Sequence, residues 1–215
     1  GQSLCMIGPN GAGKSTVLHS IFGFTNIFSG NISTQINESE TEITEMSSSQ
    51  KLKEAGISYI LQDNSVFPEM TVEENLFMGG YLKENSDAIK ESTERIFEKY
   101  DRLNERRNKP AKVLSGGERR LLEISRALVM EPEILLVDEP SIGLEPRFIE
   151  MVFEILDDLQ RNEGKTILMV EQNAKKGLEF ADIGYVLVSG NLAMAGTGEE
   201  LLNNPNVGRL FLGGE

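Results

Sequence analysis

Hydrophobic residues in this 215-residue chain occur in two kinds of segment, short continuous runs and longer stretches with helical spacing. Continuous apolar runs of four or five residues predict strands covered on both faces, as in a parallel sheet. They occur at residues 3–7, 57–61, 134–137 and 166–170. Apolar residues with helical spacing occur in three stretches: after Lys14, from Thr71 to about Val113, and after Pro146. The alternation predicts an α/β core, a mostly parallel sheet flanked by helices.

Three other segments complete the expected organisation. Residues 29–53 are polar and predict a loop with weak strands, whereas residues 185–188 and 192–195, joined by Ser189-Gly190, predict a terminal hairpin. Residues 71–113 begin with Thr71 and Glu74 in the spacing of a capping box and predict a helical subdomain. No linker composition separates it from the rest. We therefore expect one core, residues 1–70 and 114–215, with an inserted helical subdomain at 71–113.

Charge and cysteine content narrow the class of protein. The chain has 21 Lys and Arg against 34 Asp and Glu, a net charge of −13, which argues against a nucleic-acid binder with a broad basic face. Cys5 is the single cysteine, so an internal disulfide and a cysteine-built metal cluster are excluded and a reducing compartment is expected. We expect Cys5 in a buried strand. No apolar run approaches the roughly 20 residues of a membrane span, and no signal peptide is visible.

The segment between the first apolar run and the first helical stretch carries a phosphate-binding pattern. Residues 8–15 match G-x-x-x-x-G-K-[ST] in full, after a predicted strand and before a predicted helix. Glycines let several backbone N–H groups face one concavity, and the helix start adds positive potential. Lys14 can reach the β- and γ-phosphates, and the Ser15 hydroxyl can ligate Mg²⁺. The candidate phosphate-binding residues are Gly8, Pro9, Asn10, Gly11, Ala12, Gly13, Lys14, Ser15 and Thr16. A glycine-rich turn that binds nothing is the alternative, and the complete motif disfavours it.

An acidic pair follows the apolar run 134–137. A buried strand would deliver Asp138 at its carboxyl end, where open α/β sheets bind ligands. Asp138 would hold Mg²⁺, through water, and Glu139 would polarise the attacking water as a general base. A charged strand end before the turn at Pro140 would look the same in isolation, but the phosphate-binding pattern favours the catalytic interpretation.

Residues 114–118 read Leu-Ser-Gly-Gly-Glu and raise a question of their own. Ser115 and Glu118 have the spacing of a capping box before a helical stretch. Gly116 and Gly117 each cost about 1 kcal/mol of helix propensity relative to alanine, and a cap does not need them. We therefore expect another group to approach this backbone closely.

Taken together, residues 8–16, 114–118 and 134–139 resemble the ATPase subunit of ATP-binding-cassette (ABC) transporters. The resemblance implies a P-loop ATPase fold, ATP and Mg²⁺ as cofactors, and ATP hydrolysis. It also implies that two subunits pair head to tail, with the signature segment of one facing the γ-phosphate held by the other. The signature residues would be Leu114, Ser115, Gly116, Gly117 and Glu118, and side chains at the two glycines would block the approach.

Further family positions occur in order along the chain. Gln62 lies where the family has its Q-loop glutamine, which touches Mg²⁺ or the water, so the implied metal set is Ser15, Gln62 and Asp138. Residues 141–145 resemble the D-loop, which contacts the partner subunit. Gln172 stands where the family commonly has a switch histidine, and it can hydrogen-bond a phosphate without carrying a proton charge. The implied catalytic residues are Glu139, Gln62 and Gln172. His19, the only histidine, is interpreted as structural.

The family also has an adenine-stacking aromatic residue and antiparallel strands before the P-loop, and the sequence begins after that point. We therefore expect an N-terminal segment to be missing, which leaves the nucleotide affinity of this chain open. Within the family, residues 70–76, 78–80, 170–174 and 210–214 are similar to the second ATPase of branched-chain amino-acid importers, and urea importers look alike.

The resemblance implies partners and a location as well. The partners would be a second ABC ATPase subunit, transmembrane permeases and, indirectly, a periplasmic or surface solute-binding protein, without nucleic acid. The implied location is the cytoplasmic face of the cell membrane.

Three alternative functions stay open. One is a soluble ABC ATPase in DNA repair or at the ribosome, disfavoured by the lack of a coiled-coil insertion or second cassette. The others are a P-loop kinase and a degenerate nucleotide-binding scaffold.

Overall fold

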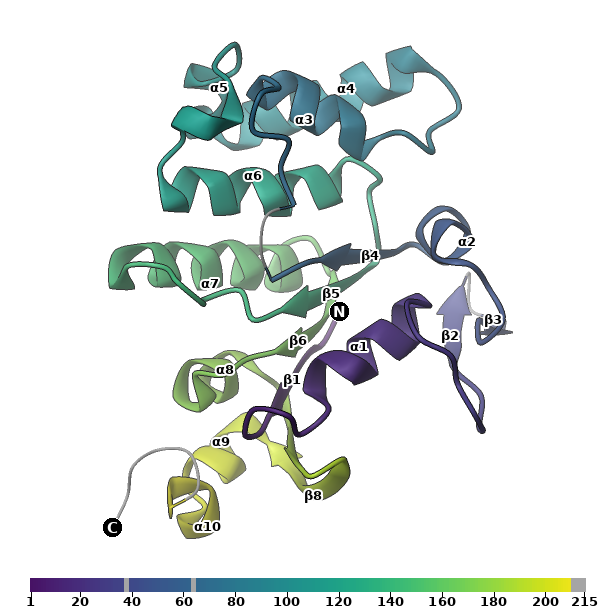
Figure 1. Ribbon diagram of the computed structural model, residues 1–215, viewed down its shortest axis with the longest axis vertical. Helices are drawn as coiled ribbons and strands as arrows, with labels where there is room; N and C mark the ends of the chain where they lie inside the picture. The colour runs from purple at the N-terminus through teal and green to yellow at the C-terminus, as the bar shows by residue number, and fades with distance from the viewer. Residues whose placement is uncertain (37–38, 63–64, 210–215) are drawn as a thin grey trace.

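The computed structural model describes residues 1–36, 39–62 and 65–209. Its centre is a six-stranded sheet in which five neighbouring strands are parallel and the last is antiparallel (Figure 1). In spatial order the strands are β4 (Ile57–Ile60), β5 (Ile134–Asp138), β6 (Thr166–Val170), β1 (Ser3–Ile7), β7 (Ile183–Val188) and β8 (Asn191–Thr197). The sheet confirms the predicted α/β class, and the predicted terminal hairpin is β7 with β8.

Helices cover both faces of this sheet, which explains its apolar strands. One face packs against α1 (Lys14–Phe22), and the other against helices that include α7 (Pro146–Arg161) and α8 (Ala174–Phe180). Pro146 occupies the first turn of α7 as predicted, and the helix ends at Arg161 with Asn162 as its cap.

Cys5 lies in β1 with no exposed surface, as predicted. Burial raises the pKa of its thiol, and the Glu171 carboxylate acts in the same direction, so the thiol stays neutral.

A separate group of short helices stands at one end of the molecule (Figure 1). It contains α3 (Val72–Gly79), α4 (Ser86–Lys99), α5 (Asp101–Glu105) and a 3₁₀ turn (Ala111–Val113). The Thr71–Glu74 capping box opens α3, as predicted. These helices share an apolar cluster with α6 (Gly116–Leu128), which begins at the signature segment and also packs on the main core through Ile124. The subdomain boundary at 113/114 stays a prediction.

The described part of residues 29–53 contains more regular structure than its composition predicts. It forms a two-stranded sheet, β2 (Ser33–Ile36) with β3 (Ser39–Glu42), and then a helix, α2 (Ser48–Lys53). The expectation of loop with weak strands was therefore wrong for α2. A reciprocal capping box between Ser47 and Gln50 starts that helix, and such a box can begin a helix whose sequence is polar. The apolar pattern also gave no indication of α9 (Gly198–Leu202) and α10 (Pro205–Val207).

Candidate functional site

The candidate residues lie at one edge of the sheet because the parallel strands end there together. The phosphate-binding loop follows β1, Gln62 follows β4, and Gln172 follows β6. Asp138 ends β5, and Glu139 comes directly after it. These four strands are direct neighbours, so loops that are far apart in the sequence become adjacent in space.

The phosphate-binding loop is held open by its glycines and by a distant hairpin. Gly11 and Gly13 have φ angles of 79° and 93°, left-handed conformations that favour glycine. The Lys14 ammonium donates to the Gly8 carbonyl at 3.0 Å, and the Gly190 N–H in the β7–β8 turn donates to the Ala12 carbonyl at 3.1 Å. Among the described residues no side chain caps the N-terminus of α1. Its first N–H groups therefore face the loop, where an anion can accept from them.

Each carboxylate oxygen of Asp138 accepts a hydrogen bond from a hydroxyl group. The Ser15 hydroxyl donates to Oδ1 at 2.9 Å, and the Tyr59 hydroxyl donates to Oδ2 at 2.8 Å. Burial raises the pKa of the Tyr59 phenol, and the Asp138 carboxylate raises it further, so this hydroxyl keeps its proton and remains a donor. The sequence interpretation did not include Tyr59. Its place on strand β4, three residues before Gln62, was the available signal.

The ring of Tyr59 belongs to an aromatic cluster beside α1. Its ring centroid lies 5.5 Å from those of Phe22 and Phe24 and 5.8 Å from that of His19. His19 therefore packs among aromatic rings, in agreement with its structural interpretation.

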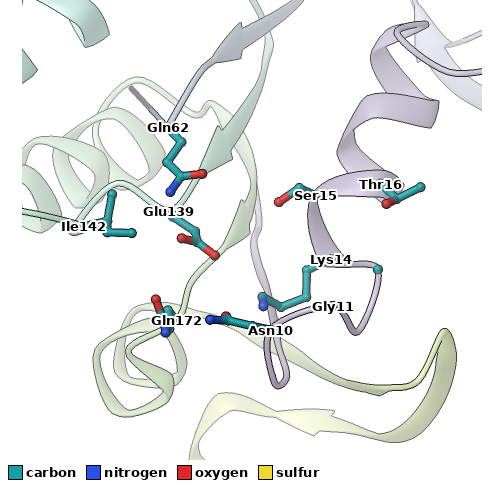
Figure 2. A pocket seen from close by; sticks show the side chains of 10 residues that line it. Asn10, Gly11, Lys14, Ser15, Thr16, Gln62, Glu139, Ile142 and Gln172 are labelled. Atoms are coloured by element: carbon teal, nitrogen blue, oxygen red, sulfur yellow. The ribbon is translucent and has the colours of Figure 1, made fainter. Parts of the chain in front are cut away.

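Glu139 follows Asp138 in a strained conformation. Its φ angle is 43°, which is uncommon for a residue other than glycine, and such conformations persist where the surroundings impose them. The Glu139 N–H donates to the Val170 carbonyl at 2.8 Å, so the neighbouring strand β6 fixes this backbone. The side chain is turned toward the phosphate-binding loop (Figure 2).

One pocket is lined by residues from each of the candidate phosphate-binding, metal-binding and catalytic sets. It has a volume of about 360 Å³. Figure 2 shows Gln62, Glu139 and Gln172 on one side of it and Lys14 and Ser15 on the other. Its lining residues are Asn10, Gly11, Gly13, Lys14, Ser15, Thr16, Gln62, Glu139, Ile142 and Gln172. Asp138 lies behind Ser15, 4% exposed. The structure therefore brings together the candidate residues from strands β1, β4, β5 and β6.

The signature segment lies outside this pocket, at the start of α6. Ser115 and Gly116 are exposed, and Ser115 forms the predicted capping box with Glu118. The Ser115 N–H bond to the carboxylate, with help from the Ser115 hydroxyl and Arg106, holds the pKa of Glu118 below its ordinary value. Glu118 is thus ionised at neutral pH and well suited to its place in the first turn.

The two glycines of this segment differ in their surroundings. A Cβ at Gly116 would meet nothing closer than Leu144 Cδ2 at 3.8 Å, so its outer surface is open. A Cβ at Gly117 would lie 2.1 Å from Cδ1 of Phe148, on α7. The expectation that both glycines keep space for an approaching group therefore needs correction: Gly117 is already required by packing within this chain.

The segment resembling a D-loop also has an inward-facing part. The Ser141 hydroxyl donates to Glu171 Oε1 at 2.9 Å, and the Asn173 N–H donates to the same oxygen at 2.8 Å. Both Ser141 and Glu171 are buried, whereas Ile142, Gly143 and Glu145 are exposed and accessible to another chain. Glu171 thereby joins the loop after β5 to the backbone next to Gln172, a link that was not expected from the sequence.

The parallel sheet, the glycine loop before α1 and the acidic end of β5 define a P-loop nucleotide-binding protein. Comparison with known proteins gives the family. Residues 1–142 match the family model described as "ABC transporter", and the chain belongs to this family. It is an ABC-type ATPase.

Relatives and solved structures agree with this assignment. The chain is 42% identical to the high-affinity branched-chain amino acid transport ATP-binding protein BraG of Pseudomonas aeruginosa, covering 100% of this chain and 89% of that protein. It is 38% identical to the probable branched-chain amino acid transport ATP-binding protein LivF of Archaeoglobus fulgidus, covering 97% and 86%. The ADP conformation of the ATP-binding cassette MJ1267 superposes with a TM-score of 0.84 at 29% identity, covering 99% of this chain and 88% of that chain.

Two further findings concern the end of the chain and membrane-spanning helices. The resemblance at residues 210–214 lies outside the described residues. Within residues 1–36, 39–62 and 65–209, no helix is long and apolar enough to cross a membrane.

Proposed function

We propose that this ATPase drives a membrane importer for branched-chain amino acids. The observation that carries the catalytic part is the convergence of Lys14, Gln62 and Glu139 on one pocket from three separate strand ends. The solute is supported by BraG and LivF, whose printed functions are branched-chain amino acid transport and with which nearly the whole chain aligns. Residues 170–174 point to the same subgroup.

ATP is the proposed nucleotide, with its phosphates in the loop at residues 8–16. Lys14 and the N–H groups at the start of α1 would bind the β- and γ-phosphates. Ser15, Gln62 and Asp138 would hold Mg²⁺, and the set fits this ion because it offers oxygen donors, two of which already lie 2.9 Å apart. Mg²⁺ supplies, when bound, positive charge beside the phosphate oxygens.

The reaction itself needs few protein groups. The Glu139 carboxylate would accept a hydrogen bond from the attacking water and orient it toward the γ-phosphate. Gln172 lies across Glu139 from Gln62 (Figure 2). Its amide would donate a hydrogen bond to a γ-phosphate oxygen. Since Gln172 cannot take up a proton, it would sense the phosphate by hydrogen bonding alone.

A second ATPase subunit would complete the site. Ser115 and Gly116 are exposed at the start of α6, where a hydroxyl and backbone N–H groups can face an anion held by another chain. Ile142 and Glu145 would extend the same contact. Either a second copy or a related subunit would serve.

Permease subunits would contact a second cleft of the same body. A cleft of about 390 Å³ lies between β4 and the helical subdomain and is lined by the exposed side chains of Phe67, Met78 and Tyr81. A membrane protein seated there would lie beside Ser65, which also lines the cleft. The proposed location is the cytoplasmic face of the cell membrane, with a periplasmic or surface solute-binding protein acting through the permease.

The test is ATP turnover by the subunit assembled with its permeases in vesicles. Leucine, isoleucine or valine, presented by the solute-binding protein, should stimulate hydrolysis. Glu139→Gln should lower kcat by about 10²–10⁴-fold while ATP still binds, because only the general base is lost. Glu154→Gln, an exposed change on α7, is the control. Normal turnover in Glu139→Gln would contradict the base assignment, and stimulation by urea alone would contradict the solute.

A further inference from the structure

Helix α6 carries a buried arginine that the proposed function does not use. Arg120 is 4% exposed and pairs with Glu123, 6% exposed, at 2.8 Å. The same guanidinium nitrogen, Nη1, lies 2.8 Å from the Leu61 carbonyl. Arg120 therefore connects the signature helix to the residue directly before Gln62.

Of the three Arg120 guanidinium nitrogens, only Nη1 has hydrogen-bond partners among the described residues. The Gln62 carbonyl lies 3.5 Å from the same nitrogen, at the limit of a hydrogen bond. Arg120 Nε and Nη2 are buried and have no hydrogen-bond partner among the described residues. Buried N–H groups without partners destabilise a protein, so an apolar pair would suit a purely structural position better. A small shift of the Gln62 backbone would bring its carbonyl into bonding range.

We infer that Arg120 is a positioning residue: it holds the backbone of Leu61 and Gln62 against α6 and so sets where the Gln62 amide lies in the phosphate pocket. This inference rests on the proposed roles of Gln62 and of the signature segment. Because α6 begins at Ser115 and Gly116, the same guanidinium links the surface offered to the partner's nucleotide with the pocket of this chain. Glu123 also lines the cleft beside Phe67, so a partner in that cleft would lie next to the acidic member of the pair.

The test replaces the pair as a unit, so that no single charge is left buried. In Arg120→Met with Glu123→Leu, we expect unchanged nucleotide binding and about a tenfold lower kcat, the effect of one lost hydrogen bond to a charged group. Combination with Gln62→Ala should give no further loss, because both changes act through the same amide. The matched control is Arg161→Met with Asp157→Leu, which removes an exposed pair on α7.

A second measurement does not depend on catalysis. Amide hydrogen exchange in peptides containing Leu61 and Gln62 should become faster in the pair variant, while exchange in the loop at residues 8–16 stays unchanged. Arg120→Lys, which keeps a charge beside Glu123 but loses the planar fork, should show the same local change if the double variant folds poorly.

Two outcomes would overturn the inference: unchanged exchange at Leu61 and Gln62, or losses of kcat that add independently to that of Gln62→Ala. Failure of the proposed function would look different. In that case Gln62→Ala and Glu139→Gln would leave hydrolysis unchanged, while the exchange measurement would still report on the Arg120 contact.

Discussion

At the scale of single residues, Asp138 shows how the acidic half of the site is held. Ser15 and Tyr59 each donate to one of its oxygens, so the carboxylate is fixed in rotation before any ion binds. Charge-assisted hydrogen bonds of this kind are stronger than those between neutral groups. Tyr59 is thus a positioning residue for the proposed metal site.

Tyr59→Phe should weaken Mg²⁺ binding while preserving the aromatic cluster. The change removes one bond to a charged group, about 1.5–3 kcal/mol, and should raise the Mg²⁺ concentration for half-maximal nucleotide binding by about 10- to 150-fold. Titration of fluorescent ATP with Mg²⁺ measures this value. Tyr185→Phe, on β7, is the control. An unchanged Mg²⁺ requirement would show that Ser15 alone orients Asp138.

Residues within motifs could be predicted from the sequence, whereas their supporting partners could not. Lys14, Ser15 and Asp138 stand in patterns whose chemistry is local. Tyr59 and Arg120 act through contacts with residues 79 and 59 positions away, and such pairs depend on how strands and helices pack. The spacing of residues along the chain does not predict such contacts.

At the scale of elements, the packing of α6 on α7 explains one of the two signature glycines. The Phe148 ring lies directly over Gly117, and no side chain fits between them. Gly116 faces outward beside Leu144. One glycine thus brings two helices together, and its neighbour leaves the helix start open to another chain.

Alanine substitutions should separate these two roles. Gly117→Ala should lower the stability of the isolated subunit by about 1–3 kcal/mol, because the methyl group overpacks the contact with Phe148. Gly116→Ala should leave that stability nearly unchanged and reduce ATP-dependent pairing of subunits instead. Denaturant unfolding and light scattering measure the two effects. Equal stability of both variants would contradict the packing account.

Elements with a strong apolar signal were predicted well. Strands β1 and β6 have the predicted bounds, because continuous apolar runs report burial on both faces. Helix α2 was missed because its start depends on a polar capping box, and α9 is only five residues long. Short polar helices take their stability from tertiary packing, which the sequence pattern does not display.

At the scale of the whole molecule, ion pairs tie the helical subdomain to the core. Lys99 on α4 contacts Asp158 at 2.6 Å and also Glu163, both in or next to α7. Although partial burial opposes it, these carboxylates raise the pKa of Lys99. Lys83 and Arg95 meet Glu131 in the turn between α6 and β5. The subdomain is therefore anchored on two sides.

Lys99→Met should loosen one anchor without unfolding the chain. The pair is partly exposed, so the loss of stability should be about 1 kcal/mol or less. Amide exchange in α4 and α5 should become faster at low salt, while ATP binding stays constant. Lys90→Met, an exposed change on the same helix, is the control. Equal exchange in both variants would show that apolar packing alone holds the subdomain.

The strand order has a consequence for biosynthesis. Strand β1 pairs with β6 and β7, so the phosphate loop leaves the ribosome well before the two strands that flank β1 in the sheet. At about 5–20 residues per second, this wait lasts on the order of ten seconds or more. During that interval β1 is an apolar strand without its neighbours in the sheet. The nucleotide pocket can be complete only after β6 and Gln172 have been synthesised.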